Sequence, residues 1–491
     1  MTEATDVNLG GETAKATIAK FAMAATGFFA SILFARELGP TMFGGYYLLF
    51  GATKLADRPL TGWATASKKR FSEDTTKRRE IVGAQFLFNA IWILVAATVA
   101  LWLADDLRSY SGLTMAPLLF VILIVSESNY ESFDRVLKAR GQIGIATWID
   151  ALRSYLTLPL QVVFVFVLAG YGADGMVYGL AGATGLMFPF VLYYLRVRPA
   201  VPSLDTLYSL IRYARYSIPS DFFATLYNRL DVILLGVLLV PATAANYEVA
   251  AQITMPATFV ATLAGSGLMP RVSKLSNEGK MVGQEVTNTI AFASILAIPI
   301  FFGALSIPEK LIATVYGPKY SLGASLVVGI AAYRFVSTQT TPLSQTMNGL
   351  DRPDVNMRIS SIALAANVVL GTVLTLWFGP IGVVVATVVA ESFIYVSTAY
   401  LLKREIPSVE LLPRPLRAQA AVGALMFFFV SAADHVIVVS SWLDLGFLLA
   451  VGATTYVSAL LVVSTELRTT VGGILNGSRL EPYVPSRILN W

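Results

Sequence analysis

Long apolar runs separated by short polar segments repeat along almost the whole chain. Many of these runs approach the roughly 20 residues that an α-helix needs to cross a bilayer. The pattern therefore predicts an all-α polytopic membrane protein with about fourteen transmembrane helices. The predicted helices cover residues 14–35, 41–66, 81–104, 113–134, 145–170, 174–195, 216–240, 243–268, 286–306, 321–345, 355–378, 380–402, 418–438 and 441–464.

The composition agrees with a membrane protein and excludes several kinds of site. The 491 residues are 55% hydrophobic and 14% charged, about half the roughly 25% charged residues of soluble proteins. The chain has no cysteine, which excludes disulfides and thiolate metal sites, and its single histidine, His435, ends an apolar run. No nucleotide-binding P-loop pattern is present. We therefore expect no metal, no cofactor and no nucleic-acid partner.

The distribution of basic residues predicts the orientation. With a cytoplasmic N-terminus, 26 of the 36 Lys and Arg residues fall in cytoplasmic segments, four in outer segments and six inside helices. Cytoplasmic loops of membrane proteins carry the excess of Lys and Arg. We therefore expect a multi-pass protein of the cell membrane with both termini in the cytoplasm.

The sequence repeats weakly at an offset near 200 residues. RFS at Arg70–Ser72 corresponds to RVS at Arg271–Ser273, and the turn YGADG at Tyr171–Gly175 corresponds to FGPIG at Phe378–Gly382. Two copies of six helices have the same orientation, as parallel repeats around a central cavity do. The predicted organisation is an N-terminal lobe (1–200), a C-terminal lobe (201–405), and two extra helices with a cytoplasmic tail (406–491).

Five stretches carry a family resemblance: ARELGPTMFGGYYLL (Ala35–Leu49), NYEVAAQITMP (Asn246–Pro256), LMPRVSKL (Leu268–Leu275), VYGPKYSLGA (Val315–Ala324) and NVVLGTVLTLWFGPIGVVVAT (Asn367–Thr387). They resemble the oligosaccharide and polysaccharide flippases of the multidrug/oligosaccharidyl-lipid/polysaccharide exporter superfamily. The LGP–FG–Y turn between the first two predicted helices is the most specific of the five. With the fourteen-helix layout, the resemblance covers about residues 10 to 465.

The resemblance implies a transporter rather than an enzyme. Such proteins move a polyprenyl-(di)phosphate-linked oligosaccharide from the cytoplasmic to the outer leaflet by alternating access. We expect a monomer, and an association with glycan-assembly enzymes is compatible with this function. A cation-coupled drug exporter and a lipid II flippase remain alternatives. Lipid II flippases typically have an arginine-rich first helix, whereas residues 14–35 contain two lysines and no arginine. A membrane transferase is disfavoured because every predicted outer loop is short.

Charged residues inside the predicted helices are the candidates for function. An ionisable side chain in the hydrocarbon costs about 2.5–3.5 kcal/mol, so it usually faces a partner or a wet cavity. Lys54, Asp57 and Arg58 in KLADRP are spaced i, i+3, i+4 on one helical face. Asp57 neutralises only one of the two cations, which predicts a net positive face suited to a phosphate. Snorkelling of Lys54 and Arg58 to the cytoplasmic surface is the alternative.

Six further residues complete the candidate set. Arg153, Arg229 and Arg334 join Lys54 and Arg58 as predicted substrate-binding residues. Asp221, Asp231 and Glu391 join Asp57 as predicted sites for coupling to Na⁺ or H⁺. For Arg153, Arg229, Asp221 and Asp231 the alternative is an ion pair that only stabilises the lobe.

Overall fold

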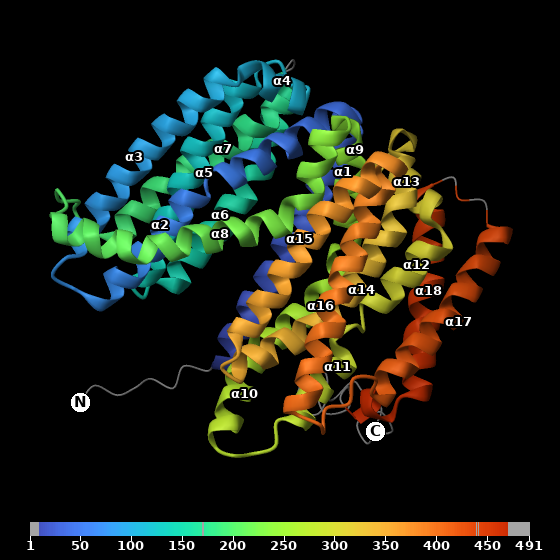
Figure 1. The fold of residues 1–491 in the computed structure, drawn as a ribbon. Helices are drawn as coiled ribbons and strands as arrows, with labels where there is room; N and C mark the ends of the chain where they lie inside the picture. Colours follow the sequence, from blue (N-terminus) through green and yellow to red (C-terminus); the bar gives the residue numbers. More distant parts are fainter. Residues whose placement is uncertain (1–8, 169–170, 438, 440, 470–491) are drawn as a thin grey trace. The chain divides into compact units, whose positions relative to one another are not determined.

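The computed structural model describes residues 9–168, 171–437, 439 and 441–469, and this described part of the chain is helical without a β-strand (Figure 1). In chain order the α-helices are α1 (Leu9–Ala56), α2 (Arg58–Glu73), α3 (Arg78–Trp102), α4 (Ala104–Ser111), α5 (Ala116–Ala139), α6 (Ile143–Val162), α7 (Gly172–Leu195), α8 (Leu204–Leu238), α9 (Pro241–Thr254), α10 (Phe259–Asn277), α11 (Gly283–Ala293), α12 (Ala297–Ser306), α13 (Pro308–Tyr316), α14 (Leu322–Gly349), α15 (Pro353–Phe378), α16 (Pro380–Glu405), α17 (Arg414–Val436) and α18 (Trp442–Val463). The predicted all-α class is confirmed.

The chain forms two compact units, Met1–Glu248 and Val249–Trp491. In the first unit α2 packs on α5 and α8, and α6 packs on α7. In the second unit α14 contacts α10, α12 and α16, and α17 packs on α12 and α18. The predicted lobes at 1–200, 201–405 and 406–491 describe an internal symmetry, and they stay a prediction, as does the cavity between them.

The predicted spans coincide with helices or helix pairs to within a few residues, apart from the spans over 41–66, 216–240 and 243–268, whose helices extend further. Within the described residues, nine helices are long and apolar enough to cross a membrane, or ten if the bent pair α4 and α5 is one span. The count of fourteen crossings therefore stays a prediction. Large apolar side chains such as Leu94, Trp102 and Trp377 are exposed on these helices, as expected where the solvent is lipid. The fold is that of an integral, multi-pass membrane protein.

The turn predicted between the first two spans is a kink within α1. Gly39 has φ +71° and ψ 172°, and Pro40 follows it. This left-handed backbone favours glycine, and proline can begin the helical segment that follows because its missing N–H has no partner in a first turn. The LGP sequence therefore divides α1 into two helical segments, the second of which carries Lys54.

The second predicted span is longer than expected and is interrupted. Helical structure ends at Ala56 and resumes at Arg58, and α2 extends to Glu73, beyond the predicted end at 66. Two glycines let neighbouring helices approach: a Cβ on Gly62 of α2 would lie 2.6 Å from the Cα of Ile218 in α8, and one on Gly44 would lie 1.9 Å from the carbonyl oxygen of Pro241. The close α2–α8 packing places α8 beside the interrupted helix.

The connection from α2 to α3 carries charged residues outside the apolar spans. The Thr76 hydroxyl and N–H both donate to Asp74, at 2.6 and 2.8 Å. These hydrogen bonds lower the pKa of the Asp74 carboxyl. We predicted cytoplasmic termini from such basic and polar connections; residues 1–8 and 470–491, which hold those termini, lie outside the described residues.

Candidate functional site

The KLADRP stretch lies at the interruption between α1 and α2. Pro59 is in the first turn of α2 and has no N–H to donate. The Arg58 Nε donates to the Lys54 carbonyl at 2.7 Å, and the Trp92 indole donates to the Ala56 carbonyl at 2.9 Å. Side chains thus satisfy backbone carbonyls at the break, as a broken helix inside a membrane protein requires.

The break holds two charged groups in the interior. Asp57 is fully buried, and Arg58 is 8% exposed. An Arg58 Nη2 lies 2.5 Å from Asp57 Oδ1. The side chains therefore point into the unit rather than snorkelling to a surface. Asp57 also forms an ion pair with Lys54, whose Nζ lies 3.5 Å from Asp57 Oδ2.

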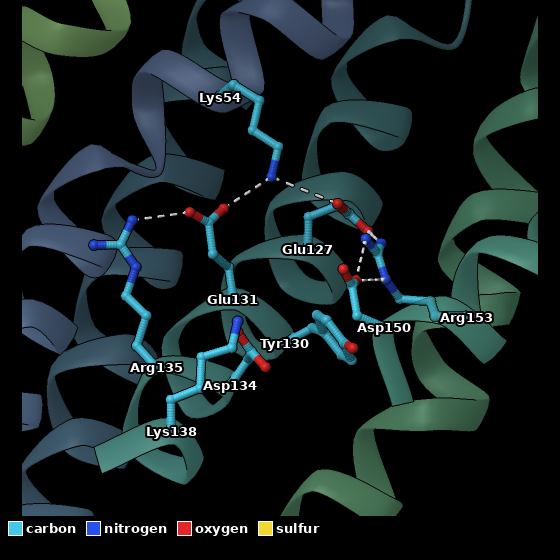
Figure 2. Close-up of a pocket in the computed structure, with 9 residues that line it drawn as sticks. All are labelled: Lys54, Glu127, Tyr130, Glu131, Asp134, Arg135, Lys138, Asp150 and Arg153. Atoms are coloured by element: carbon cyan, nitrogen blue, oxygen red, sulfur yellow. Dashed lines mark hydrogen bonds and ion pairs between the residues drawn. The ribbon is translucent and has the colours of Figure 1, made fainter. Parts of the chain in front are cut away.

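Helix α5 supplies the carboxylates that face these cations, and Figure 2 shows the two beside Lys54. Lys54 Nζ lies 3.1 Å from Glu131 Oε2 and 3.5 Å from Glu127 Oε2. Arg58 Nη2 is also 3.5 Å from Glu131 Oε2. Glu127, Glu131 and Arg135 follow one another at four-residue spacing, so they share one face of α5.

Helix α6 adds the next ion pairs on the other side of Glu127. Arg153 Nη1 lies 3.1 Å from Glu127 Oε1, and Arg153 Nη2 lies 3.1 Å from Asp150 Oδ1 (Figure 2). The guanidinium also lies over the Tyr130 ring, 4.6 Å from its centroid. The Thr184 hydroxyl of α7 donates to Glu127 at 2.7 Å. Glu127 therefore joins Lys54 and Arg153 in one network.

These residues surround a cavity of about 280 Å³. Its lining is almost entirely ionisable: Lys54, Glu127, Tyr130, Glu131, Asp134, Arg135, Lys138, Asp150 and Arg153 (Figure 2). Four of these side chains are cations and four are carboxylates, so the fully ionised lining is neutral. The predicted net positive face is therefore wrong, because α5 brings carboxylates to both Lys54 and Arg58.

Two of the first unit's candidates, Lys54 and Arg153, line this cavity, and others are connected to them by ion pairs. Lys54, Asp57, Arg58 and Arg153 belong to one network, and Asp221 of α8 joins it through Arg135 at 2.8 Å. Arg229 of α8 lies over the Phe50 ring at 5.9 Å, and Lys54 lies over the same ring at 5.5 Å.

The remaining candidates lie elsewhere. Asp231 accepts a hydrogen bond from the Tyr247 hydroxyl. In the second unit, the Arg334 guanidinium is 5.4 Å from the Tyr333 ring centroid, and Glu391 on α16 is 4% exposed. The roles assigned to these residues in binding and coupling stay predictions.

Sequence reasoning missed the residues of α5. Their signal is the segment SESNYESFDRVLKAR, in which carboxylates and basic residues recur at four-residue spacing near a predicted helix end. From the sequence we placed residues up to 134 in the predicted helix over 113–134 without singling out Glu127 or Glu131, and we assigned Arg135–Arg140 to a cytoplasmic segment. Within the described residues no group of three or more His, Cys, Asp or Glu side chains forms a metal site. The prediction of Na⁺ or H⁺ coupling stays a prediction.

Known sequences similar to this chain concern glycan assembly. The family model described as "Polysaccharide biosynthesis protein" matches residues 33–324. Two similar proteins come from Haloferax volcanii. The probable flippase AglR is 26% identical over 471 residues, 92% of this chain and 95% of the relative. The probable low-salt glycan biosynthesis flippase Agl15 is 25% identical over 387 residues, 78% of this chain and 80% of the relative.

Solved structures share the fold at low sequence identity. The lipid II flippase MurJ, in an inward closed conformation, superimposes with a TM-score of 0.76 at 14% identity, covering 91% of this chain and 98% of that one. An inward-facing multidrug resistance MATE transporter of the MOP superfamily gives 0.62 at 16% identity, covering 79% and 98%. These likenesses show an all-helical transporter fold.

Proposed function

Since the chain belongs to the family of polysaccharide biosynthesis proteins, we propose that it is a flippase for a lipid-linked oligosaccharide. It moves a polyprenyl-(di)phosphate-linked oligosaccharide from the cytoplasmic to the outer leaflet by alternating access. The names of the two Haloferax volcanii relatives support this function over drug export. The transport changes no covalent bond, so the protein acts as a transporter and not as an enzyme.

The buried ion network supports a role in holding the phosphate linker. Glu131 and Glu127 compensate Lys54, Arg58 and Arg153, which removes the large cost of unpaired buried charge. Each phosphate of a diester linker carries one negative charge, as a carboxylate does, and offers similar acceptor oxygens. The linker binds by replacing a carboxylate as the partner of Lys54, Arg58 or Arg153. Arg229 and Arg334 are further candidates for contact with the substrate.

The exchange of partners also provides a means of coupling. A carboxylate that the phosphate displaces loses its cation and becomes a site for H⁺ or Na⁺, and Asp57 and Asp221 are connected to the same cations. Asp231 and Glu391 are the remaining coupling candidates. Each negative charge that moves outward across an inside-negative membrane gains about 2.3 kcal/mol per 100 mV, so the linker itself supplies part of the driving force.

The proposal extends to the protein's localisation, orientation and partners. The chain lies in the cell membrane with both termini in the cytoplasm, as the distribution of Lys and Arg favours. It works as a monomer beside the enzymes that assemble the glycan on its carrier.

The deciding experiment uses a strain that lacks this gene. The lipid-linked glycan should accumulate on the cytoplasmic face of its membrane, and the wild-type chain should restore the surface glycan. If no such lipid accumulates, the protein is not this flippase. The Lys54→Gln variant should lower transport about tenfold or more, because a lost charge-assisted hydrogen bond is worth about 1.5–3 kcal/mol.

Lys69→Gln is the matched control. Lys69 lies on the α2 surface, 3.8 Å from Glu73, with its side chain 45% exposed. Its replacement should leave transport unchanged. Full transport by Lys54→Gln, at wild-type expression, would exclude the phosphate-binding role of the network while leaving the flippase function intact.

A further inference from the structure

A second cavity of about 240 Å³ in the first unit adjoins the charged one. The two cavities share one lining residue, Arg153. Beyond Arg153 the lining of the second cavity carries no charged side chain and consists of apolar, hydroxyl, amide and aromatic groups from α1, α6 and α7. The chemistry of the wall therefore changes at Arg153 from ionic to neutral and polar.

One face of α6 runs through this change. Arg153, Thr157 and Gln161 follow one another at four-residue spacing, with Ser154 beside them, and all four line the second cavity. Eight residues of α-helix span about 12 Å. A ligand that lies along this face with an anionic group at Arg153 meets hydroxyl and amide groups next.

The hydroxyls of this cavity are arranged as acceptors. Thr157 donates to the Arg153 carbonyl at 2.8 Å, and Thr26 donates to the Ala22 carbonyl at 2.9 Å. Since each hydroxyl has one hydrogen and two lone pairs, these two oxygens keep the capacity to accept. They suit a ligand rich in hydroxyl donors.

Aromatic rings from α1 complete the wall. Phe34, Tyr46 and Tyr47 line the cavity, and Tyr46 is 6% exposed. A concave site with apolar and aromatic walls and a few placed polar groups is the usual form of a small-molecule site. An isoprenoid chain offers no donor to the acceptor lone pairs that the Thr26 and Thr157 hydroxyls still present. A sugar ring offers both hydroxyl donors and apolar C–H faces.

We propose that this second cavity binds the sugar that is attached directly to the phosphate of the lipid-linked oligosaccharide. The inference rests on the proposed flippase function and adds a place for the glycan: the phosphate lies at Arg153 and the first sugar lies along Ser154, Thr157 and Gln161. The adjoining ionic and neutral cavities then match the adjoining phosphate and sugar of one molecule.

Gly27 offers a way to fill the cavity without disturbing the packing. It lines the second cavity, and a Cβ built on it meets no atom within 4 Å. Its backbone is helical, so a larger residue is not strained there. Gly185 on α7 is a matched control, because it is exposed like Gly27 and a Cβ there also meets no atom within 4 Å, but it does not line the cavity. Gly27→Leu fills the cavity, whereas Gly185→Leu does not.

The experiment measures binding of two lipids to the purified full chain in bilayer discs. The probes are a polyprenyl phosphate that carries one hexose and the same polyprenyl phosphate without sugar. Wild type and Gly185→Leu should bind the hexose-bearing lipid about tenfold or more tighter. Gly27→Leu should lose this preference and keep its affinity for the sugar-free lipid. Thr157→Val, which removes one acceptor and adds no bulk, should reduce the preference about threefold to tenfold.

The outcomes separate this inference from the proposed function. If the wild-type chain binds both lipids equally, or if Gly27→Leu keeps the full preference, the sugar site is wrong and the flippase function stands. If the wild-type chain binds neither lipid, the proposed function fails and the sugar site fails with it. Loss of binding to both lipids by Gly27→Leu alone, with wild-type thermal stability, would place the phosphate rather than the sugar in this cavity.

Discussion

Arg135 of α5 and Asp221 of α8 form an ion pair, with Nη1 and Oδ2 2.8 Å apart although the residues are 86 positions apart in the chain. The same nitrogen donates to the Thr65 hydroxyl of α2 at 2.6 Å. Nη2 of Arg135 donates to Glu131 at 3.1 Å. One guanidinium therefore connects α2, α5 and α8, and it links Asp221 to the charged cavity.

We expect Arg135 and Asp221 to be energetically coupled. Their side chains are 26% and 23% exposed, so the pair lies between a surface pair and a buried one. A double-mutant cycle with Arg135→Ala and Asp221→Ala should give a coupling free energy of about 1–2 kcal/mol. Thermal unfolding of the purified variants measures it.

The second unit contains a matched control pair for this cycle. Arg352 and Glu405 are 2.7 Å apart but 46% and 45% exposed. A double-mutant cycle with Arg352→Ala and Glu405→Ala should give a coupling free energy of about 0.5 kcal/mol or less, because water screens an exposed ion pair. Equal coupling energies in the two cycles would show that burial adds nothing to the Arg135–Asp221 pair.

A second prediction separates the structural role of Lys54 from its role in binding. Lys54→Gln leaves Glu127 and Glu131 with one cation fewer and should lower the free energy of unfolding by about 3 kcal/mol. Adding Glu131→Gln removes one carboxylate as well, so the network is again neutral. The double variant should recover most of the stability.

Transport should not recover with the stability. The double variant still lacks the Lys54 ammonium, so its rate of flipping in reconstituted vesicles should stay about tenfold or more below wild type. Recovery of both stability and transport would mean that Lys54 is required only to compensate Glu131.

A third prediction concerns the contact between α2 and α8. In Gly62→Ala the new Cβ would lie 2.6 Å from the Ile218 Cα. Because that neighbour is backbone, α8 must shift, and we expect a loss of about 1–3 kcal/mol in the free energy of unfolding. Gly144→Ala on α6 meets no atom within 4 Å and should change stability by about 0.5 kcal/mol or less. Thermal unfolding of both variants tests this, and a fully stable Gly62→Ala contradicts it.

A fourth prediction concerns the attachment of α17 in the second unit. Gln419 is fully buried, and its Nε2 donates to the Ala291 carbonyl at 2.7 Å, close to the break between α11 and α12. Gln419→Leu leaves the Ala291 carbonyl without this donor and should lower the free energy of unfolding by about 1–3 kcal/mol. Gln284→Leu removes an exposed amide that donates to Asn288 within the same helix and should change the free energy of unfolding by about 0.5 kcal/mol or less. Protease sensitivity of the α17–α18 region should rise in the first variant alone.

The sequence was a good guide to the helices. The apolar runs predict them to within a few residues in most cases, because helix formation within a membrane depends on local hydrophobicity and on backbone hydrogen bonds inside each segment. The LGP turn was also predicted, since Gly39 and Pro40 favour a kink through their own backbone preferences. The family resemblance agrees with the family that matches the chain.

The charge of the candidate site could not be read in the same way. Lys54, Asp57 and Arg58 are neighbours in the chain, so their shared face was visible. Glu131, the partner of Lys54, is 77 residues away, and a spacing rule for one helix carries no information about the next. The predicted positive face was wrong for this reason, although its residues do meet in one network.

Helical segments, their apolar surfaces and the shared face of Lys54, Asp57 and Arg58 therefore follow from the amino-acid sequence, because they depend on residues within a few turns of one another. The neutral balance of the charged cavity, the link from Arg135 to Asp221, and the neighbouring neutral cavity on α6 follow only from tertiary packing. Packing decides them because each needs side chains from separate helices to converge. The cost of burying an unpaired charge then favours an arrangement in which every buried cation has a carboxylate beside it.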